Sequence, residues 1–190
     1  MLRLKTTFIM LALWGSVHAQ TNTDSMTIRK TVLDFYTWYS SIIKTSETQQ
    51  YSPEFSEDKN GKTTLAFDEY FQNLRNYSFS ESFILKEKES YQVCIDNLKE
   101  IDYSKLDSTL TDLSDFEEIE CDFFNYYKLL GTMDRMDGVE IKNVKITNDK
   151  ATVSIQYFTI ESDNSVYLWN NNTNVELLKN NSRWEINAIR

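Results

Sequence analysis

In the first half of the chain, hydrophobic residues recur at steps of three and four, which is the period of an amphipathic helix. The clearest run extends from Asp24 to about Lys44. Its large apolar side chains form one stripe, made of Ile28, Val32, Phe35, Tyr36, Tyr39, Ile42 and Ile43. Trp38 lies partly off this stripe, toward one flank. Asp24 or Ser25 can accept hydrogen bonds from the first free backbone amides, so we expect the helix to begin there.

Three further segments, residues 66–76, about 80–101 and 115–130, have the same period. Their inward-facing residues are Phe67, Tyr70, Phe71 and Leu74, then Phe83, Ile84, Tyr91, Cys94, Ile95 and Leu98, then Phe116, Ile119, Phe123, Tyr126, Tyr127 and Leu130. Ser80 or Ser82 can cap the second segment. Between the first helix and these segments, residues 45–62 are polar and hold Pro53 and Gly61, which predicts a long exposed loop.

From residue 139 onward the hydrophobic period changes to two, which predicts strands. The expected strands are residues 139–146, 151–160, a third holding 166–169 and 175–178 that Asn170–Asn172 interrupt, and 183–189. On the last, Trp184, Ile186 and Ala188 point to one face, and Asn148-Asp149 and Asn180-Asn181 mark turns. Helices followed by a meander predict an α+β domain, with the helices packed on one face of a curved antiparallel sheet.

The first 19 residues follow the pattern of a cleavable export signal. Arg3 and Lys5 precede a short apolar stretch at residues 8–14, and Ala19 closes the small-residue region before Gln20. The stretch is shorter than the roughly 20 residues that cross a bilayer. We therefore expect cleavage after Ala19, a periplasmic or secreted protein without a membrane anchor, and a single domain over residues 20–190.

Loss of this segment changes the chemistry of the chain. Its two basic residues leave, so the net charge goes from −9 to −11. That balance argues against nucleic acid and anionic membranes as partners, and it permits a basic protein partner, although acidity also serves plain solubility. His18, the only histidine, leaves as well. Catalysis by histidine triads and zinc or iron sites built on histidine are therefore excluded.

Two cysteines, Cys94 and Cys121, remain. Outside the cytoplasm two thiols often pair, and a bridge here would stabilise the domain by roughly 3–4 kcal/mol. Two separate buried thiols, packing as small hydrophobes, are an equal alternative. Neither cysteine lies in a C-x-x-C motif, which disfavours a redox enzyme.

Several short patterns resemble those of a known superfamily. They are Phe35-Tyr36-x-Trp38-Tyr39 on the first helix, Ala151-x-Val153-x-Ile155 on a strand, and Val175-x-Leu177 followed by Trp184-x-Ile186. Over residues 26–190 the chain resembles the nuclear-transport-factor-two-like (cystatin-like cone) superfamily. More narrowly, it resembles an exported bacterial domain-of-unknown-function family (number 3828). The resemblance implies a cone-like fold and export. The superfamily includes isomerases, small-ligand binders and immunity proteins, so fold alone assigns no function.

Acidic residues offer little for a metal. Asp115, Glu117, Glu118, Glu120 and Asp122 cluster in sequence, but on a helix they fan around the axis, whereas calcium needs six to eight oxygens around one point. Residues 134–138 lack the alternating acids and terminal glutamate of a calcium loop. We expect no metal and no cofactor.

The candidate pocket residues are Tyr36, Tyr39, Tyr126 and Tyr127, with Asp34 or Asp122 as a nearby acid. An aspartate base and a tyrosine donor make a ketosteroid-isomerase-like site, although aromatics at helical spacing are also typical of a core.

The leading hypothesis is a non-enzymatic exported domain without catalytic residues. It would bind a protein or a small molecule through the concave face of its sheet, and an immunity protein against a basic toxin is one form of it. The alternative is a histidine-free isomerase- or lyase-like enzyme that uses Asp and Tyr in the cone. An enzyme would need a buried carboxylate facing a tyrosine hydroxyl, and a binding module would show a filled cone and an exposed apolar patch.

Overall fold

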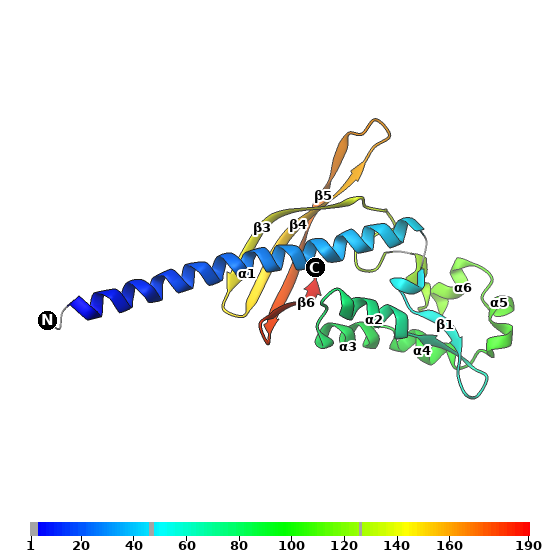
Figure 1. Cartoon of the computed structure of the whole chain (residues 1–190). Coiled ribbons are helices and arrows are strands. Elements are labelled where there is room, and N and C mark those ends of the chain that lie inside the picture. Colours follow the sequence, from blue (N-terminus) through cyan, green and yellow to red (C-terminus); the bar gives the residue numbers. More distant parts are fainter. Residues whose placement is uncertain (1–3, 46–47, 126) are drawn as a thin grey trace.

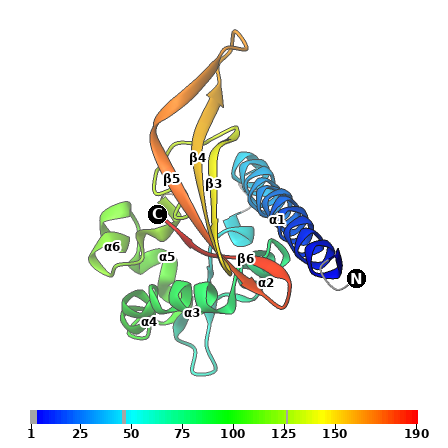
Figure 2. The same cartoon turned by 90° about the vertical axis from the view of Figure 1, so that its left-hand side faces the viewer.

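The computed structural model describes residues 4–45, 48–125 and 127–190, and describes side chains from residue 23 onward except those of Phe124 and Asn125. Its architecture is the predicted α+β arrangement. Helices occupy the N-terminal two thirds, and a four-stranded antiparallel sheet occupies the C-terminal part (Figure 1). The long helix α1 lies along one face of this sheet, and the shorter helices lie at its lower end (Figure 2).

The sheet is a meander in the order β3-β4-β5-β6, as the alternating pattern predicts. Its strands are β3 (Gly138–Thr147), β4 (Lys150–Ile160), β5 (Val166–Asn180) and β6 (Arg183–Ile189). Asn148, Asn164 and Asn181 have positive φ at the three hairpin turns, a conformation that asparagine tolerates better than most residues. Every second residue of β4 from position 151 to 157 is buried, which places the core on the helix-covered face.

The predicted interruption of the third strand is instead a bulge within a continuous β5. Gln156 pairs with Asn172 and Phe158 pairs with Leu168, so residues 169–171 all lie opposite Tyr157. Extra residues on one strand bend a hairpin away from its sheet. The end of the β4–β5 hairpin, residues 158–168, accordingly projects from the body of the protein (Figures 1 and 2). We call this segment the β4–β5 arm.

Helix α1 (Leu4–Thr45) buries the predicted stripe against the sheet, and all seven stripe residues are at most 5% exposed. The predicted start at Asp24 or Ser25 is wrong, because the helix continues without a break through the preceding residues. Asp24 therefore caps nothing, and its carboxylate binds the far end of the sheet instead. The predicted cleavage after Ala19 falls on residues whose side chains lie outside the described part.

Asp24 clamps α1 to strands β5 and β6. Both of its oxygens accept hydrogen bonds from Lys179 Nζ at 2.9 Å, and Oδ1 also accepts from Trp184 Nε1 at 3.0 Å. The Lys179 hydrogen bond, more than the Trp184 hydrogen bond, holds the pKa of the Asp24 carboxyl below its usual 3.8, against the opposing effect of burial.

Substitution of Asp24 by asparagine is expected to destabilise the fold by about 1 kcal/mol at pH 7. Because the pKa of Asp24 is lower in the folded protein, its contribution is complete above the unfolded value near 3.8 and is lost as the pH falls below it. Urea unfolding of both proteins from pH 7 to pH 3 checks this, and the two curves should converge at the acid end. Asp34→Asn, which removes an exposed ion pair, is the control. A constant difference at all pH values would contradict the clamp.

The helices in the middle of the chain are shorter and more numerous than the hydrophobic period predicts. This part of the chain contains α2 (Asp68–Asn76), α3 (Glu81–Glu89), α4 (Gln92–Leu98), α5 (Leu106–Thr109) and α6 (Leu113–Glu118), together with three 3-10 turns, η1 (Thr48–Gln50), η2 (Tyr103–Lys105) and η3 (Asp122–Asn125). Helix α2 agrees with the prediction and buries Tyr70, Phe71 and Leu74. The Ser80 hydroxyl caps α3, also as predicted, because it accepts a hydrogen bond from the backbone amide of Phe83.

Three predictions for the segment between residues 45 and 130 are wrong. The loop at 45–62 contains strand β1 (Glu54–Glu57), which pairs with β2 (Thr63–Ala66), since Phe55 lies opposite Leu65 across the Gly61 turn. The helix at 80–101 breaks between α3 and α4, where Tyr91 leaves helical backbone angles. The helix at 115–130 ends at Glu118, because Glu120 takes a positive φ of 55°.

Cys94 and Cys121 are joined by a disulfide. The bridge connects α4 to the segment that follows α6, and both residues are at most 1% exposed. It therefore holds the short helices together at a place where the backbone between residues 99 and 121 changes direction several times.

Candidate functional site

The predicted pocket tyrosines do not form one pocket. Tyr36 and Tyr39 are fully buried between α1 and the sheet, and the Tyr36 hydroxyl lies 3.4 Å from the Tyr157 hydroxyl. Tyr127 packs against Tyr51, with ring centroids 5.9 Å apart, and its hydroxyl accepts a hydrogen bond from Arg135. Tyr126 lies outside the described residues. The three described tyrosines thus serve as core and loop contacts.

The predicted acids also lie elsewhere. Asp34 is on the outer side of α1, where it forms an exposed ion pair with Lys30. Asp122 begins η3, and within the described part of the chain it forms no hydrogen bond to a tyrosine. Neither acid is therefore placed to work with Tyr36 or Tyr39.

The carboxylate that does lie among buried tyrosines is Glu87, on α3. It is 8% exposed, and its Oε1 atom receives three donors. The hydroxyls of Tyr70 and Tyr91 donate at 2.9 Å and 3.1 Å, and Lys128 Nζ lies at 3.0 Å. Burial first, and then the charge of Glu87, raise the pKa of Tyr70, which keeps this hydroxyl a donor at neutral pH. Glu87 is consequently a rigidly oriented carboxylate.

Lys128 is held as firmly as its partner. Its ammonium lies 3.8 Å from the centroid of the Tyr91 ring and donates to Ser90 Oγ. Burial lowers the pKa of Lys128, and the charge of Glu87 opposes this shift. The cation is thereby fixed over one oxygen of Glu87 and one aromatic face.

A cavity of about 290 Å³ opens beside this cluster, between α3, the turn at residues 128–131 and the sheet. Its lining is mostly apolar and consists of Phe83, Glu87, Lys128, Leu129, Leu130, Gly131, Tyr157, Thr173, Ile189 and Arg190. The contacts described for Glu87 all involve Oε1, namely the hydroxyls of Tyr70 and Tyr91 and the ammonium of Lys128. The cavity thus combines a largely apolar wall with one carboxylate side chain, that of Glu87.

Sequence reasoning missed Glu87, although a signal existed. Glu87 lies three residues after Ile84 and four before Tyr91, on the face of the helix that the apolar period assigns to the core. A charged residue on a buried stripe requires partners. Lys128 and Tyr70 come from other elements, and their approach could not be read from spacing.

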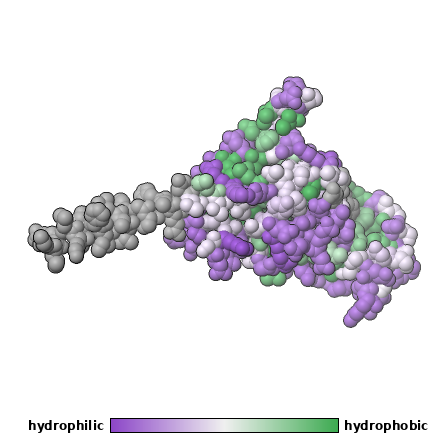
Figure 3. Space-filling view, in the orientation of Figure 1, coloured by the Kyte–Doolittle hydropathy of each residue, from purple (hydrophilic) through white to green (hydrophobic). Residues whose placement is uncertain are grey.

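An apolar patch covers the β4–β5 arm. Ile160, Val166 and Leu168 share one face of the hairpin and are 51%, 60% and 37% exposed, and Tyr167, opposite Thr159 on the other face, is 54% exposed. Figure 3 shows hydrophobic side chains gathered along this projection. Exposed apolar patches of this kind mark interaction surfaces.

Asp115, the first residue of the acidic cluster at 115–122, helps to form the start of helix α6. Asp115 accepts backbone hydrogen bonds from Thr111 and Asp112 at the start of α6, which lower the pKa of its carboxyl. Across the described residues, no group of three or more acidic or cysteine side chains converges as a metal site would require. Nor does any helix, as far as it is described, have the length and apolar character needed to span a membrane.

The chain matches no family model and no curated protein. Two solved structures are similar to it. One is a variant of a protein named Rd1NTF2_05, with a TM-score of 0.32, 11% identity, and 90% of this chain and 97% of that chain covered. The other is named an NTF2-like transpeptidase from Campylobacter jejuni, with a TM-score of 0.22, 15% identity and 57% and 99% coverage.

Both names contain the abbreviation NTF2. TM-scores this low assign no activity to this chain. Membership of the exported family of unknown function therefore stays an expectation, and the functional proposal rests on the residues around Glu87.

Proposed function

We propose that this protein binds a small molecule in the cavity beside Glu87 and does not convert it chemically. One observation carries the proposal. Three donors hold Oε1 of Glu87 in place, none of the hydrogen bonds described for Glu87 involves Oε2, and Glu87 lines a largely apolar cavity. A fixed polar group within an apolar lining is the usual design of a small-ligand site.

The lining indicates the chemistry of the ligand. Phe83, Leu130 and Ile189 favour an apolar body, and Glu87 Oε2 requires a hydrogen-bond donor such as a hydroxyl or an amine. A volume of about 290 Å³ is at the small end of ligand pockets, which run from about 300 to 1,000 Å³. We therefore infer a compact amphipathic ligand.

Binding is favoured over the isomerase-like alternative because of where the donors point. An isomerase of that type needs a tyrosine hydroxyl directed at the substrate. Here the Tyr70 and Tyr91 hydroxyls both donate to Glu87, and Lys128 is paired with the same oxygen. None of these three groups is free to stabilise a charge that develops on a substrate, and the hydroxyl of Tyr157, the tyrosine that lines the cavity, lies 3.4 Å from the buried Tyr36 hydroxyl.

The test is a cavity-filling variant. Leu130→Trp places an indole ring in the cavity, whereas Leu85→Trp adds the same ring at an exposed position of α3 and is the matched control. In a thermal-shift and NMR screen of small aromatic and aliphatic amines and alcohols, we expect compounds that bind the wild type and Leu85→Trp alike. Their affinity for Leu130→Trp should be at least about tenfold weaker, a loss of about 1.4 kcal/mol. Binders that do not distinguish the two variants would refute the site.

A protein partner is a second candidate, and the apolar patch on the β4–β5 arm favours it. Glu161 and Asp163 lie in the turn at its tip, so the arm would fit an apolar pocket with a basic rim. The same variants separate the candidates. A protein captured from cell-envelope extract through the arm would bind Leu130→Trp as well as it binds the wild type.

A further inference from the structure

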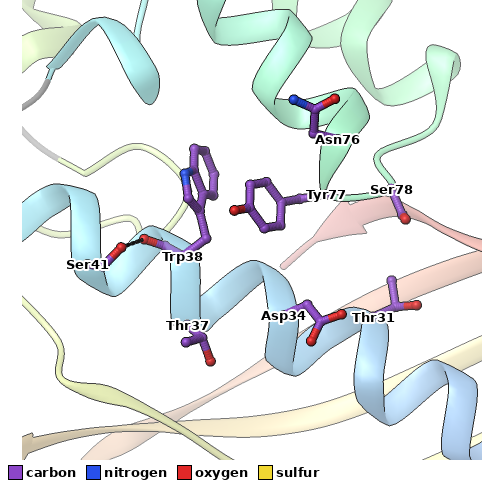
Figure 4. A pocket seen from close by; sticks show the side chains of 8 residues that line it. All are labelled: Thr31, Asp34, Thr37, Trp38, Ser41, Asn76, Tyr77 and Ser78. Atoms are coloured by element: carbon purple, nitrogen blue, oxygen red, sulfur yellow. Dashed lines mark hydrogen bonds between the residues drawn. The ribbon is translucent and has the colours of Figure 1, made fainter.

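A second, larger hollow lies on the outer side of α1 and shares no lining residue with the cavity beside Glu87. It has a volume of about 450 Å³ and is formed by one face of α1, the last residue of α2 and the turn at residues 77–78 (Figure 4). We call it the α1 groove. Its floor combines two aromatic rings with small polar side chains, a composition unlike the apolar wall of the Glu87 cavity.

The aromatic part of the groove is a stacked pair. The rings of Trp38 and Tyr77 lie 4.4 Å apart between centroids, at 17° to each other, and both residues are partly buried. The Trp38 ring also packs against the Phe35 ring, with their centroids 6.0 Å apart. Two residues after Tyr77, Phe79 forms a β-bridge with Ile186 of strand β6, which ties this turn to the sheet. The Trp38–Tyr77 pair is therefore held in place before any ligand binds, which lowers the entropic cost of binding.

Polar groups with unused hydrogen-bonding capacity surround this pair. In the described structure the side-chain hydroxyls of Thr31, Thr37 and Tyr77 form no hydrogen bond. Asp34 binds Lys30 through Oδ2 and leaves Oδ1 open, and the Asn76 side chain accepts from Gln72 while its amide nitrogen remains unused. Donors and acceptors thus lie next to the stacked aromatic pair.

We propose that the α1 groove binds a neutral saccharide. The C–H face of a sugar ring would stack on an outer ring face of the Trp38–Tyr77 stack, and its hydroxyls would bond Asp34, the two threonines and Asn76. A sugar has an apolar face and a rim of groups that both donate and accept, which is the complement of this lining. Asp34 disfavours an anion, and its ion pair with Lys30 already satisfies the charge that a cation would need.

The experiment titrates ¹⁵N-labelled protein with glucose, galactose, N-acetylglucosamine, maltose and cellobiose, and with indole as an aromatic probe that lacks hydroxyls. We expect at least one saccharide to shift the indole N–H signal of Trp38, which Trp38→Phe identifies by its loss. Asp34→Asn and Thr37→Val change exposed side chains and should leave the rest of the spectrum intact. Asp34→Asn should weaken binding about tenfold, the effect of one hydrogen bond to a charged group.

Trp169→Phe is the control, because Trp169 contacts Tyr157 on the sheet and lies outside the groove. It should bind the saccharide as the wild type does. The proposal is overturned if no sugar shifts the Trp38 signal, if indole alone does so, or if Asp34→Asn and Thr37→Val bind the sugar unchanged.

Discussion

Replacement of Glu87 by alanine is expected to destabilise the protein by about 3 kcal/mol, because it leaves a largely buried cation without its counter-ion. Lys128 would keep its place over Tyr91 without a carboxylate, and the buried hydroxyls of Tyr70 and Tyr91 would lose their common acceptor. This cost lies at the low end of the range for breaking a buried ion pair, because the Lys128 side chain is 23% exposed and partly reaches water.

Denaturant unfolding of the purified variant measures this effect, with Glu89→Ala on the exposed side of the same helix as the control. The double variant Glu87→Ala/Lys128→Ala should recover part of the loss, since it no longer buries an unpaired charge. If Glu87→Ala unfolds at the same denaturant concentration as Glu89→Ala, the cluster does not contribute to stability as we describe.

The second large effect concerns the disulfide. Replacement of both Cys94 and Cys121 by alanine is expected to cost about 3–4 kcal/mol, because the bridge closes a 27-residue separation and restricts the unfolded chain. Guanidinium unfolding with and without a reducing agent measures it. The wild type in reductant should approach the midpoint of the double variant.

The double variant is also its own control, because reductant should leave its unfolding curve unchanged. Both sulfurs are buried, so reduction should require denaturant to expose them. A wild-type midpoint that does not respond to reductant, even after prolonged incubation in denaturant, would contradict a bridge between these residues.

Local pattern predicted the parts of the fold in which neighbours in sequence share one environment. The stripe on α1, the helix at 68–76 and the meander of strands are correct, because burial on one face repeats with the period of the backbone. The pattern could not locate breaks that depend on distant contacts. Examples are the end of α6 before Cys121 and the bulge opposite Tyr157.

The candidate site shows the same division more sharply. By itself the sequence determined the α+β class, the order of helices before sheet, the buried face of α1 and the absence of any histidine after residue 18. Only the tertiary structure decided which acid is buried. Tyr70, Glu87 and Lys128 come from α2, α3 and a later turn, and Lys128 lies 41 positions after Glu87 in the chain. A carboxylate is stable in a core only where donors converge on it, and that convergence is a property of packing, which periodicity along one segment does not contain.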